Sequence, residues 1–263
     1  MTQVADLADL AGATIALLLL AAFAAGWVDA VVGGGGLIQL PALLLVPGLA
    51  PVQALATNKL ASIMGTSVSA ATYWRRIRPD LRTALPTALA ALLGAAGGAG
   101  LASWLPGEVI EPIVLVALVG VGTWVALRPE VGRVQSLRWS GRRHYGAAAL
   151  IGAGIGFYDG LVGPGTGTFL VIALVAVLGY GFLEASAKAK IVNAATNLGA
   201  LLVFAAAGAP VWRLGMAMGA ANVAGAYLGA RMAVARGSGF VRVVFLVVVA
   251  ALVLRLGWDV LTR

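Results

Sequence analysis

The chain has 263 residues, of which 61% are hydrophobic and only 11% are charged, and its mean hydropathy is +0.97. Soluble globular domains average about a quarter charged residues, so this composition excludes the soluble class. Apolar runs of about 20 residues, the length that crosses a bilayer core as a helix, recur along the chain, as in 11–32 and 109–127. We therefore predict one all-α polytopic membrane domain.

Two absences narrow the chemistry further. The sequence contains no cysteine, which excludes disulfides, thiolate metal sites and cysteine nucleophiles. Its single histidine, His144, lies in an arginine-rich stretch that we interpret as a loop, which argues against histidine-based metal or base chemistry within the membrane. We expect no cofactor, no metal site and no catalytic residue.

The net charge of +8 would suggest nucleic-acid binding in a soluble protein. Here the arginines are concentrated in short stretches with aromatic neighbours, 75–82 and 128–143, which is typical of the cytoplasmic edge of a membrane protein. We therefore expect contact with the lipid bilayer and no nucleic-acid partner.

Taken in chain order, the apolar segments form two sets of five. The first set lies in an N-terminal half, 1–128, and comprises 12–32, 37–47, 52–74, 83–105 and 109–127. A basic cytoplasmic loop, 129–145, connects it to a C-terminal half, 146–263, with segments 146–162, 167–179, 185–207, 212–235 and 240–258. This predicts about eight to ten transmembrane or re-entrant helical segments in one transport domain.

Glycines and charged residues recur between the two halves. Gly26, Asp29, Val32, Gly33 and Gly35 have counterparts 130 residues later, and Lys59, Gly94 and Gly98 have counterparts 131 residues later. Internal repeats of this length in a hydrophobic chain indicate a transporter in which two halves enclose a site near the bilayer midplane. We interpret Gly94 and Gly98, and their counterparts Gly225 and Gly229, as helix-packing motifs.

The distribution of arginines favours an inverted repeat. If the first two segments of each half form a pair, three crossings remain in each half and the second half is inverted relative to the first. Twelve arginines then face one side of the membrane, and by the positive-inside rule that side is cytoplasmic. Both termini then lie on the outer side of a bacterial inner membrane. Segment 37–47 is only 11 residues, about 16 Å as a helix, so a re-entrant or broken element is an alternative to a full crossing.

A glycine-rich break interrupts each half at an equivalent place. Unwound backbone at membrane depth is tolerated where it is buried in protein or lines a wet cavity, and the N–H groups that start the next half-helix favour an anion. Close helix packing is the alternative explanation. We assign these breaks to a substrate site: Gly33, Gly34, Gly35 and Gly36 in the first half, and Gly163, Gly165 and Thr166 in the second.

Two lysines occupy equivalent positions within apolar segments, where an unpaired charge is expensive. Each begins a polar stripe on one helical face, with Lys59, Ser62 and Thr66 in the first half and Lys190, Asn193 and Asn197 in the second. Two such faces around one cavity would bind an oxyanion. The alternatives are lysines that extend to the membrane interface or that pair internally with Asp29 and Asp159. For Lys188 we expect an i, i+4 pair with Glu184 or a ligand role.

Asp29 and Asp159 precede the two breaks and have two interpretations. Either carboxylate could cap the N–H groups of the following half-helix, which we favour, or carry a coupled proton. In a further alternative, each aspartate holds the lysine of its own half until an anion displaces it.

Several of these residues carry a family resemblance. The segment Gly26-Trp27-Val28-Asp29 leading into Val32-Gly33-Gly34-Gly35-Gly36-Leu37, together with Ala56-Thr57-Asn58-Lys59 and a second copy in the C-terminal half, resembles the TauE/SafE family of sulfite and organosulfonate exporters. The resemblance adds Thr57 and Asn58 to the candidate substrate contacts. The second break departs from the pattern, because it reads Gly163-Pro164-Gly165-Thr166-Gly167 instead of a glycine run.

The resemblance implies a secondary carrier for sulfite, sulfoacetate or another organosulfonate, working as an exporter by alternating access between the two halves, with proton coupling as an option. The alternatives are a passive anion channel and an uptake permease for another small organic anion. An intramembrane hydrolase is disfavoured because no buried Ser–His pair or GxGD-type aspartate context is present, so we expect no enzymatic activity. The sequence leaves open whether the protein is a homodimer.

Overall fold

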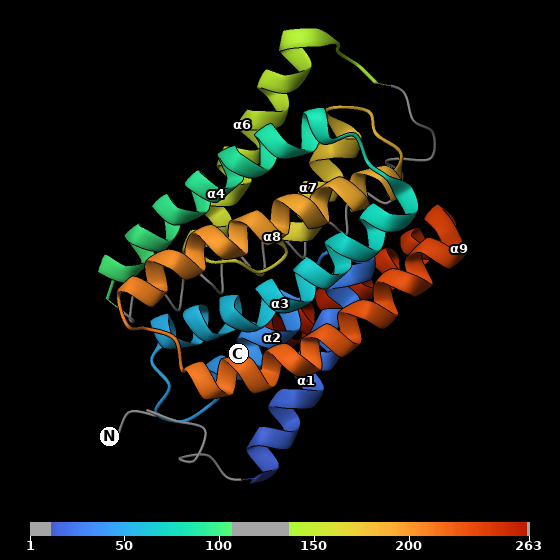
Figure 1. Ribbon diagram of the computed structural model, residues 1–263. Helices are drawn as coiled ribbons and strands as arrows, with labels where there is room; N and C mark the ends of the chain where they lie inside the picture. Colours follow the sequence, from blue (N-terminus) through green and yellow to red (C-terminus); the bar gives the residue numbers. More distant parts are fainter. Residues whose placement is uncertain (1–11, 107–136, 262–263) are drawn as a thin grey trace.

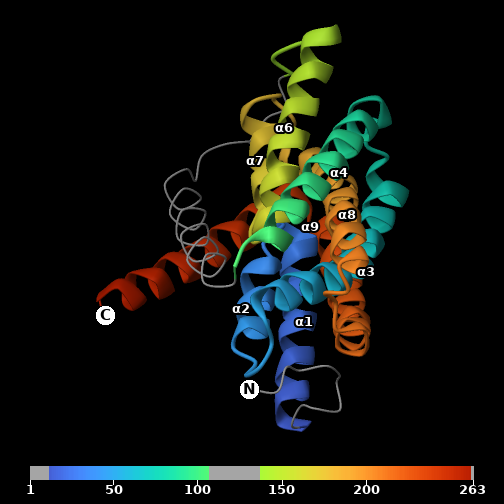
Figure 2. The ribbon, with the colours of Figure 1, turned by 90° about the vertical axis from the view of Figure 1, so that its left-hand side faces the viewer.

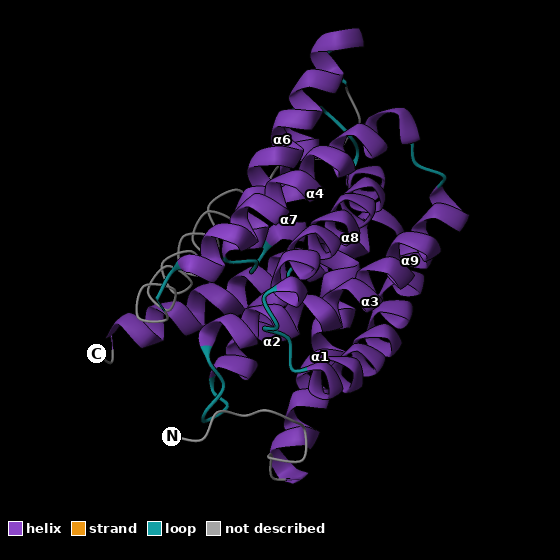
Figure 3. Cartoon of the chain, turned by 60° about the vertical axis from the view of Figure 1, so that its left-hand side comes forward, coloured by secondary structure: helices purple, strands orange, loops and turns teal. Residues whose placement is uncertain are grey.

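The structure is a computed structural model that describes residues 12–106 and 137–261. Within these residues every regular element is a helix and none is a strand (Figures 1 and 3). The helices are α1 (Gly12–Val32), α2 (Gly36–Leu44), α3 (Pro51–Ile77), α4 (Leu81–Trp104), α6 (Gly141–Leu161), α7 (Thr166–Ala176), α8 (Phe182–Ala206) and α9 (Trp212–Leu261). The prediction of an all-α protein is confirmed.

The helix boundaries follow the expected segments closely, with two exceptions. α6 begins at Gly141, inside the stretch expected to be loop, so the basic residues next to His144 form its first turn. The segments 212–235 and 240–258 form one element, α9, but a non-helical residue, Gly237, with φ 71° and ψ −168°, divides it where the sequence predicts a break. The expected segment 109–127 lies outside the described residues.

Helix lengths distinguish spanning elements from shorter ones. Three of the described helices, α1, α4 and α8, are long and apolar enough to cross a membrane. α2 and α7 contain 9 and 11 residues, so their lengths of about 14 and about 16 Å cover only half of a hydrocarbon core. Both therefore fit re-entrant elements better than complete crossings.

α3 and α8 run antiparallel through the middle of the bundle (Figure 1). The side chain of Lys188, near the start of α8, reaches the backbone carbonyl of Asp80, just beyond the end of α3. At the opposite end, the N–H of Val211, just after α8, donates to the hydroxyl of Thr57 near the start of α3. Between these ends the Asn197 amide donates to the Thr66 hydroxyl. The two helices that carry the polar stripes are thus neighbours, and their chains run in opposite directions.

Glycines allow the outer helices to pack at backbone distance. A Cβ atom on Gly94 or Gly98 of α4 would come within 2.3 Å of a carbonyl oxygen of α6. A Cβ on Gly225 or Gly229 of α9 would come within 2.5 Å of a carbonyl oxygen of α1. These contacts confirm that both pairs are packing motifs, and they join α4 to α6 and α1 to α9. Figure 2 shows the C-terminal part of α9 projecting away from this bundle.

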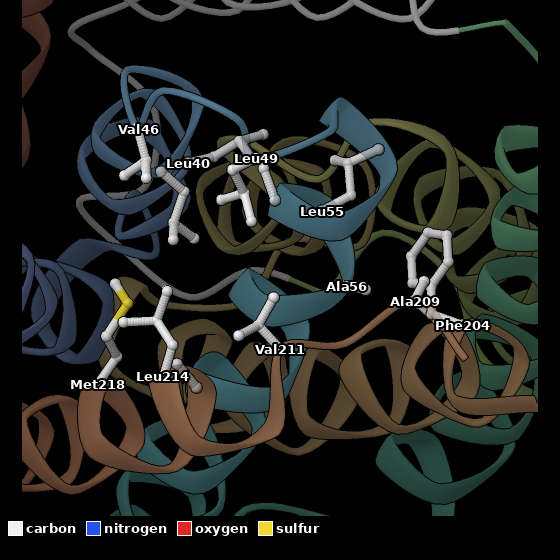
Figure 4. Packing of buried hydrophobic residues seen from close by; sticks show 14 of the residues in the cluster. Leu40, Val46, Leu49, Leu55, Ala56, Phe204, Ala209, Val211, Leu214 and Met218 are labelled. Carbon is white, nitrogen blue, oxygen red and sulfur yellow. The ribbon is translucent and has the colours of Figure 1, made fainter. Parts of the chain in front are cut away.

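The largest apolar cluster draws its residues from both halves of the chain (Figure 4). Leu40 of α2 and Leu55 of α3 pack with Phe204 of α8 and with Leu214 and Met218 of α9. Burial of these side chains stabilises the packing of α2, α3, α8 and α9 around the polar faces described below.

Candidate functional site

The two glycine-rich breaks contact each other at the centre of the bundle. The carbonyl of Gly33 accepts a hydrogen bond from the N–H of Thr168 at 3.1 Å, and the Thr168 hydroxyl donates to the carbonyl of Val32 at 3.0 Å. Gly33 has φ +89°, and a Cβ there would lie 2.2 Å from the carbonyl carbon of Gly167. Because only glycine fits both the dihedral angle and the space, the break needs it for conformation as well as for packing.

The second break has the same local conformation and is held by side chains. Gly163 has φ +92°, close to the value at its counterpart Gly33. The Thr166 hydroxyl lies 2.5 Å from Oδ1 of Asp159 and 2.8 Å from the carbonyl of Gly163, and the Tyr158 hydroxyl donates to the carbonyl of Pro164 at 2.6 Å. These bonds fix the turn from which α7 begins.

The two repeat-equivalent lysines, Lys59 and Lys190, each form an ion pair with the aspartate of the opposite half. Lys59 Nζ on α3 lies 2.7 Å from Oδ2 of Asp159 on α6, and the two side chains are 1% and 2% exposed. Lys190 Nζ on α8 lies 3.2 Å from Oδ2 of Asp29 on α1 and also donates to the backbone carbonyl of Asp29. The Asp29 side chain is 14% exposed, so this second pair is the more accessible one.

This crosswise arrangement decides between the interpretations of the charges. The interpretation in which each aspartate holds the lysine of its own half is wrong, because both ion pairs join the two halves. Within the described part of the chain, neither Asp29 nor Asp159 accepts a hydrogen bond from a backbone N–H of α2 or α7. The carboxylates bind lysine ammonium groups and, at the start of α7, the Thr166 hydroxyl, and capping of backbone N–H groups stays a hypothesis.

A small cavity lies where the breaks and the ion pairs meet. Its volume is about 20 Å³, enough for roughly one water molecule. The sequence-predicted residues that line it are Asp29, Gly33, Gly36, Asn58, Lys59, Ser62, Thr66, Asp159, Gly163, Gly165, Thr166, Asn193 and Asn197. The structure thus gathers residues of both stripes and both breaks around one space.

Four candidates lie outside the cavity wall. Lys190 contacts the cavity only through its partner Asp29. Thr57 is fully buried and its hydroxyl accepts the bond from Val211, so its observed contact is between helices. Gly34 faces side chains of α1, α2 and α7, and Gly35 faces Ala25 and the Cβ atom of Asp29 on α1.

Residues not singled out from the sequence also contribute to the site. Gly167 lines the cavity directly after Thr166. Behind Asn58, Gln39 donates to its backbone carbonyl at 3.4 Å, and Asn222 on α9 donates to Gln39 Oε1 at 2.9 Å. Gln39 is the only amide in the apolar helix α2, and this was the sequence signal that could have identified it, because a buried polar group needs a hydrogen-bond partner.

Lys188 belongs to a separate polar cluster at the end of the bundle. Its ammonium lies 3.3 Å from Glu184 and 3.9 Å from Asp80, which confirms the expected pairing with Glu184. Burial alone would raise the pKa of Asp80, but hydrogen bonds from the Thr83 hydroxyl and the Arg82 N–H, together with the charge of Lys188, lower it below its ordinary value.

His144 extends this cluster. It is buried in the first turn of α6, and its Nε2 lies 2.8 Å from the Tyr180 hydroxyl, which donates to the hydroxyl of Thr83. The assignment of His144 to a loop is therefore wrong, because Tyr180 gives it a buried partner. Neither Lys188 nor His144 lines the central cavity.

Comparison with known proteins identifies the family of the chain. The family model described as sulfite exporter TauE/SafE matches residues 18–256. The chain belongs to the TauE/SafE family. The match covers all the residues that line the cavity, from Asp29 to Asn197, which confirms the resemblance carried by the two breaks and the Lys59 segment.

Curated relatives of this TauE/SafE chain are named as transporters. The chain is 38% identical over 251 residues to the probable membrane transporter protein ORF9 of Sinorhizobium sp, with 95% of each chain covered. It is 34% identical to the probable membrane transporter protein YfcA of Escherichia coli strain K12, over 93% of this chain and 90% of the relative. A probable membrane transporter protein of Haemophilus influenzae is also 34% identical, over 87% of this chain and 88% of the relative.

No solved structure matches the chain significantly. The family, the relatives and the apolar helices together establish a multi-pass membrane transporter of the TauE/SafE family.

Proposed function

We propose that this transporter is a secondary carrier that exports small sulfur-containing oxyanions, such as sulfite, sulfoacetate or another organosulfonate, across the bacterial inner membrane. One observation carries the proposal: two ion pairs that join the halves, Lys59 with Asp159 and Lys190 with Asp29, meet at a cavity bordered by both glycine-rich breaks, which Lys190 reaches through Asp29. The antiparallel course of α3 and α8 supports an inverted repeat, and the family description supports the substrate class.

The ion pairs suggest how an anion is recognised. A buried lysine is stabilised by a carboxylate, and a sulfonate or sulfite oxygen offers the same kind of charged acceptor. An entering anion would compete with Asp29 for Lys190 and with Asp159 for Lys59, while Ser62, Thr66, Asn193 and Asn197 offer further hydrogen bonds. Recognition would therefore open the contacts between the halves, which is the step that alternating access requires.

The cavity volume supports a carrier over a passive channel. A space of about 20 Å³ holds about one water molecule, so a sulfite or sulfonate can bind there only if the residues around it move apart. In proteoliposomes the carrier should give saturable flux. Unitary currents at channel-like rates would overturn this part of the proposal.

Charge counting links the direction of transport to its coupling. Two lysines and two aspartates leave the site neutral, so a bound monovalent anion adds one negative charge that is either carried across or compensated by a proton. An uncompensated anion is driven outward by an inside-negative potential of 100 mV with about 2.3 kcal/mol. Export therefore fits electrogenic transport.

Uptake is a second candidate, in which a proton compensates the charge of the anion. The Asp29 side chain is 14% exposed, so its carboxylate is the group that favours this candidate as the carrier of the compensating proton. An imposed potential distinguishes the two, because it changes the rate of electrogenic export and leaves proton-compensated uptake unchanged. In the uptake case, Asp29→Asn should abolish the response of the flux to a pH gradient.

The substrate site is tested by measuring affinity for sulfite, sulfoacetate, thiosulfate and sulfate in the parent, Lys59→Ala and Lys190→Ala. Loss of one charge-assisted contact costs about 1.5 to 3 kcal/mol, so each variant should bind its best anion about 10-fold to 100-fold more weakly.

Lys188→Ala is the matched control, because this lysine is equally buried and ion-paired on α8 but does not line the cavity. It should retain the affinity of the parent. Unchanged affinity in both Lys59→Ala and Lys190→Ala would exclude the site as described.

A further inference from the structure

A second cavity lies between α3 and α9, near the basic end of the bundle. Its volume is about 340 Å³, and it is lined by Thr72, Arg76, Arg231, Val234 and Ala235. It shares no lining residue with the central cavity. We propose that this second cavity binds the headgroup of an anionic phospholipid, with the two arginines as ligands of the phosphate.

The charges of the cavity are not neutralised by acidic side chains. Among the side chains that the structure describes, no carboxylate lies within ion-pair distance of Arg76 or Arg231. Arg231 donates to the Tyr227 hydroxyl at 3.0 Å and lies over its ring, with the guanidinium carbon 5.4 Å from the ring centroid. The tyrosine orients one guanidinium group and leaves its remaining N–H groups available. Two guanidinium groups from different helices present the forked donors that suit a phosphate.

The surroundings match the headgroup level of a bilayer. Arg76 lies in the last turn of α3, where the chain leaves its apolar stretch, and Trp74 and Tyr227 are exposed nearby, as is typical of membrane interfaces. Val234 and Ala235 give the cavity an apolar side, which suits the glycerol and the first acyl carbons of a lipid.

The size of the cavity favours a lipid over free phosphate. Ligand pockets of about 300 to 1,000 Å³ hold molecules with many non-hydrogen atoms, and inorganic phosphate would fill only a small part of 340 Å³. A phospholipid places its phosphate between the arginines and its glycerol against the apolar side. Basic pockets between helices on the cytoplasmic side of a membrane are suited to such headgroups.

The position of the cavity gives the lipid a role. α3 and α9 belong to the two different halves of the chain, and Tyr73 of α3 packs in one cluster with Ala226, Ala230 and Ala233 of α9. A headgroup bound by Arg76 and Arg231 therefore connects the halves directly beside this packed junction.

The test measures lipid retention by the full chain in nanodiscs of phosphatidylglycerol mixed with phosphatidylcholine. Native mass spectrometry counts the lipids that remain bound to the parent, to R76Q/R231Q and to R75Q/R82Q. The last variant is a matched control, because it removes two exposed arginines from the same end of the bundle that do not line the cavity.

We expect the parent to retain phosphatidylglycerol over phosphatidylcholine, and R76Q/R231Q to lose about tenfold more of this preference than R75Q/R82Q. An equal loss of this preference in both variants would show that it depends on the general positive charge of the surface, and would overturn the proposal. Inorganic phosphate should not displace the lipid at millimolar concentration, and displacement that depends on Arg76 and Arg231 would assign the cavity to free phosphate instead. All four arginines are exposed, so the helical circular dichroism of both variants should equal that of the parent.

Discussion

The ion pair between Lys59 and Asp159 gives a quantitative prediction for stability. Both side chains are almost completely buried, with Nζ and Oδ2 2.7 Å apart. Lys59→Met leaves Asp159 charged with only the Thr166 hydroxyl as its side-chain partner. Removing one partner of a buried pair costs about 3 to 5 kcal/mol in free energy of unfolding, because the other charge stays in a low-dielectric environment.

The pair between Lys190 and Asp29 provides an internal comparison. The Asp29 side chain is 14% exposed, so water can reach its carboxylate after Lys190→Met. The cost should therefore be at most about 2 kcal/mol. The double variant Lys59→Met/Asp159→Asn removes both buried charges and should recover most of the stability lost in Lys59→Met, because a neutral pair needs no charge compensation.

Thermal unfolding in detergent, followed by tryptophan fluorescence at a fixed scan rate, measures these differences. For a chain of this size 1 kcal/mol corresponds to about 2 to 4 °C, so Lys59→Met should lower the apparent Tm by about 6 to 20 °C and Lys190→Met by distinctly less. Two results would refute the reasoning: equal losses in Lys59→Met and Lys190→Met, or a double variant no more stable than Lys59→Met.

Two further predictions concern the breaks and the end of the bundle. Gly33→Ala should lower the Tm by several degrees, because its φ of +89° alone costs an L-residue about 1 to 2 kcal/mol and the added Cβ meets backbone at 2.2 Å. The control is Gly34→Ala, whose added Cβ meets nothing closer than 3.5 Å, and its Tm should equal that of the parent. Equal Tm values for the two variants would contradict this account. Since the folded-state pKa of Asp80 lies below its ordinary value, its stabilising contribution is complete above about pH 4 and is lost as the pH falls further. The Tm difference between the parent and Asp80→Asn should accordingly shrink below pH 4 in a pH series of melting curves, and a difference that grows there would contradict the sign.

The sequence predicts the helices well because apolar runs between prolines, glycines and charges are local features. Segment 12–32 coincides with α1, and the gap between 235 and 240 contains the kink at Gly237. His144 was misassigned because its neighbours Arg142 and Arg143 are exposed, whereas its own burial depends on Tyr180, 36 residues away. Local composition carries no information about such a distant partner.

The candidate site shows the same division between local and distant information. Matching offsets identify Lys59 and Lys190 as equivalent, and Asp29 and Asp159 as equivalent, but equivalence does not say which lysine meets which aspartate. That depends on how α3 and α8 cross between α1 and α6, which is set by packing of the whole bundle. Equivalence of the two breaks likewise gives no indication that Gly33 contacts Gly167, which is not its counterpart.

The crosswise ion pairs also affect how the protein is made. Lys59 is synthesised 100 residues before its partner Asp159, and Asp29 is synthesised 161 residues before its partner Lys190. At about 5 to 20 residues per second, the growing chain holds these charges unpaired for several seconds to half a minute. α1 and α3 therefore reach their final positions only after α6 and α8 have been inserted, and a ribosomal product that ends before Asp159 contains a buried lysine that no later residue can neutralise.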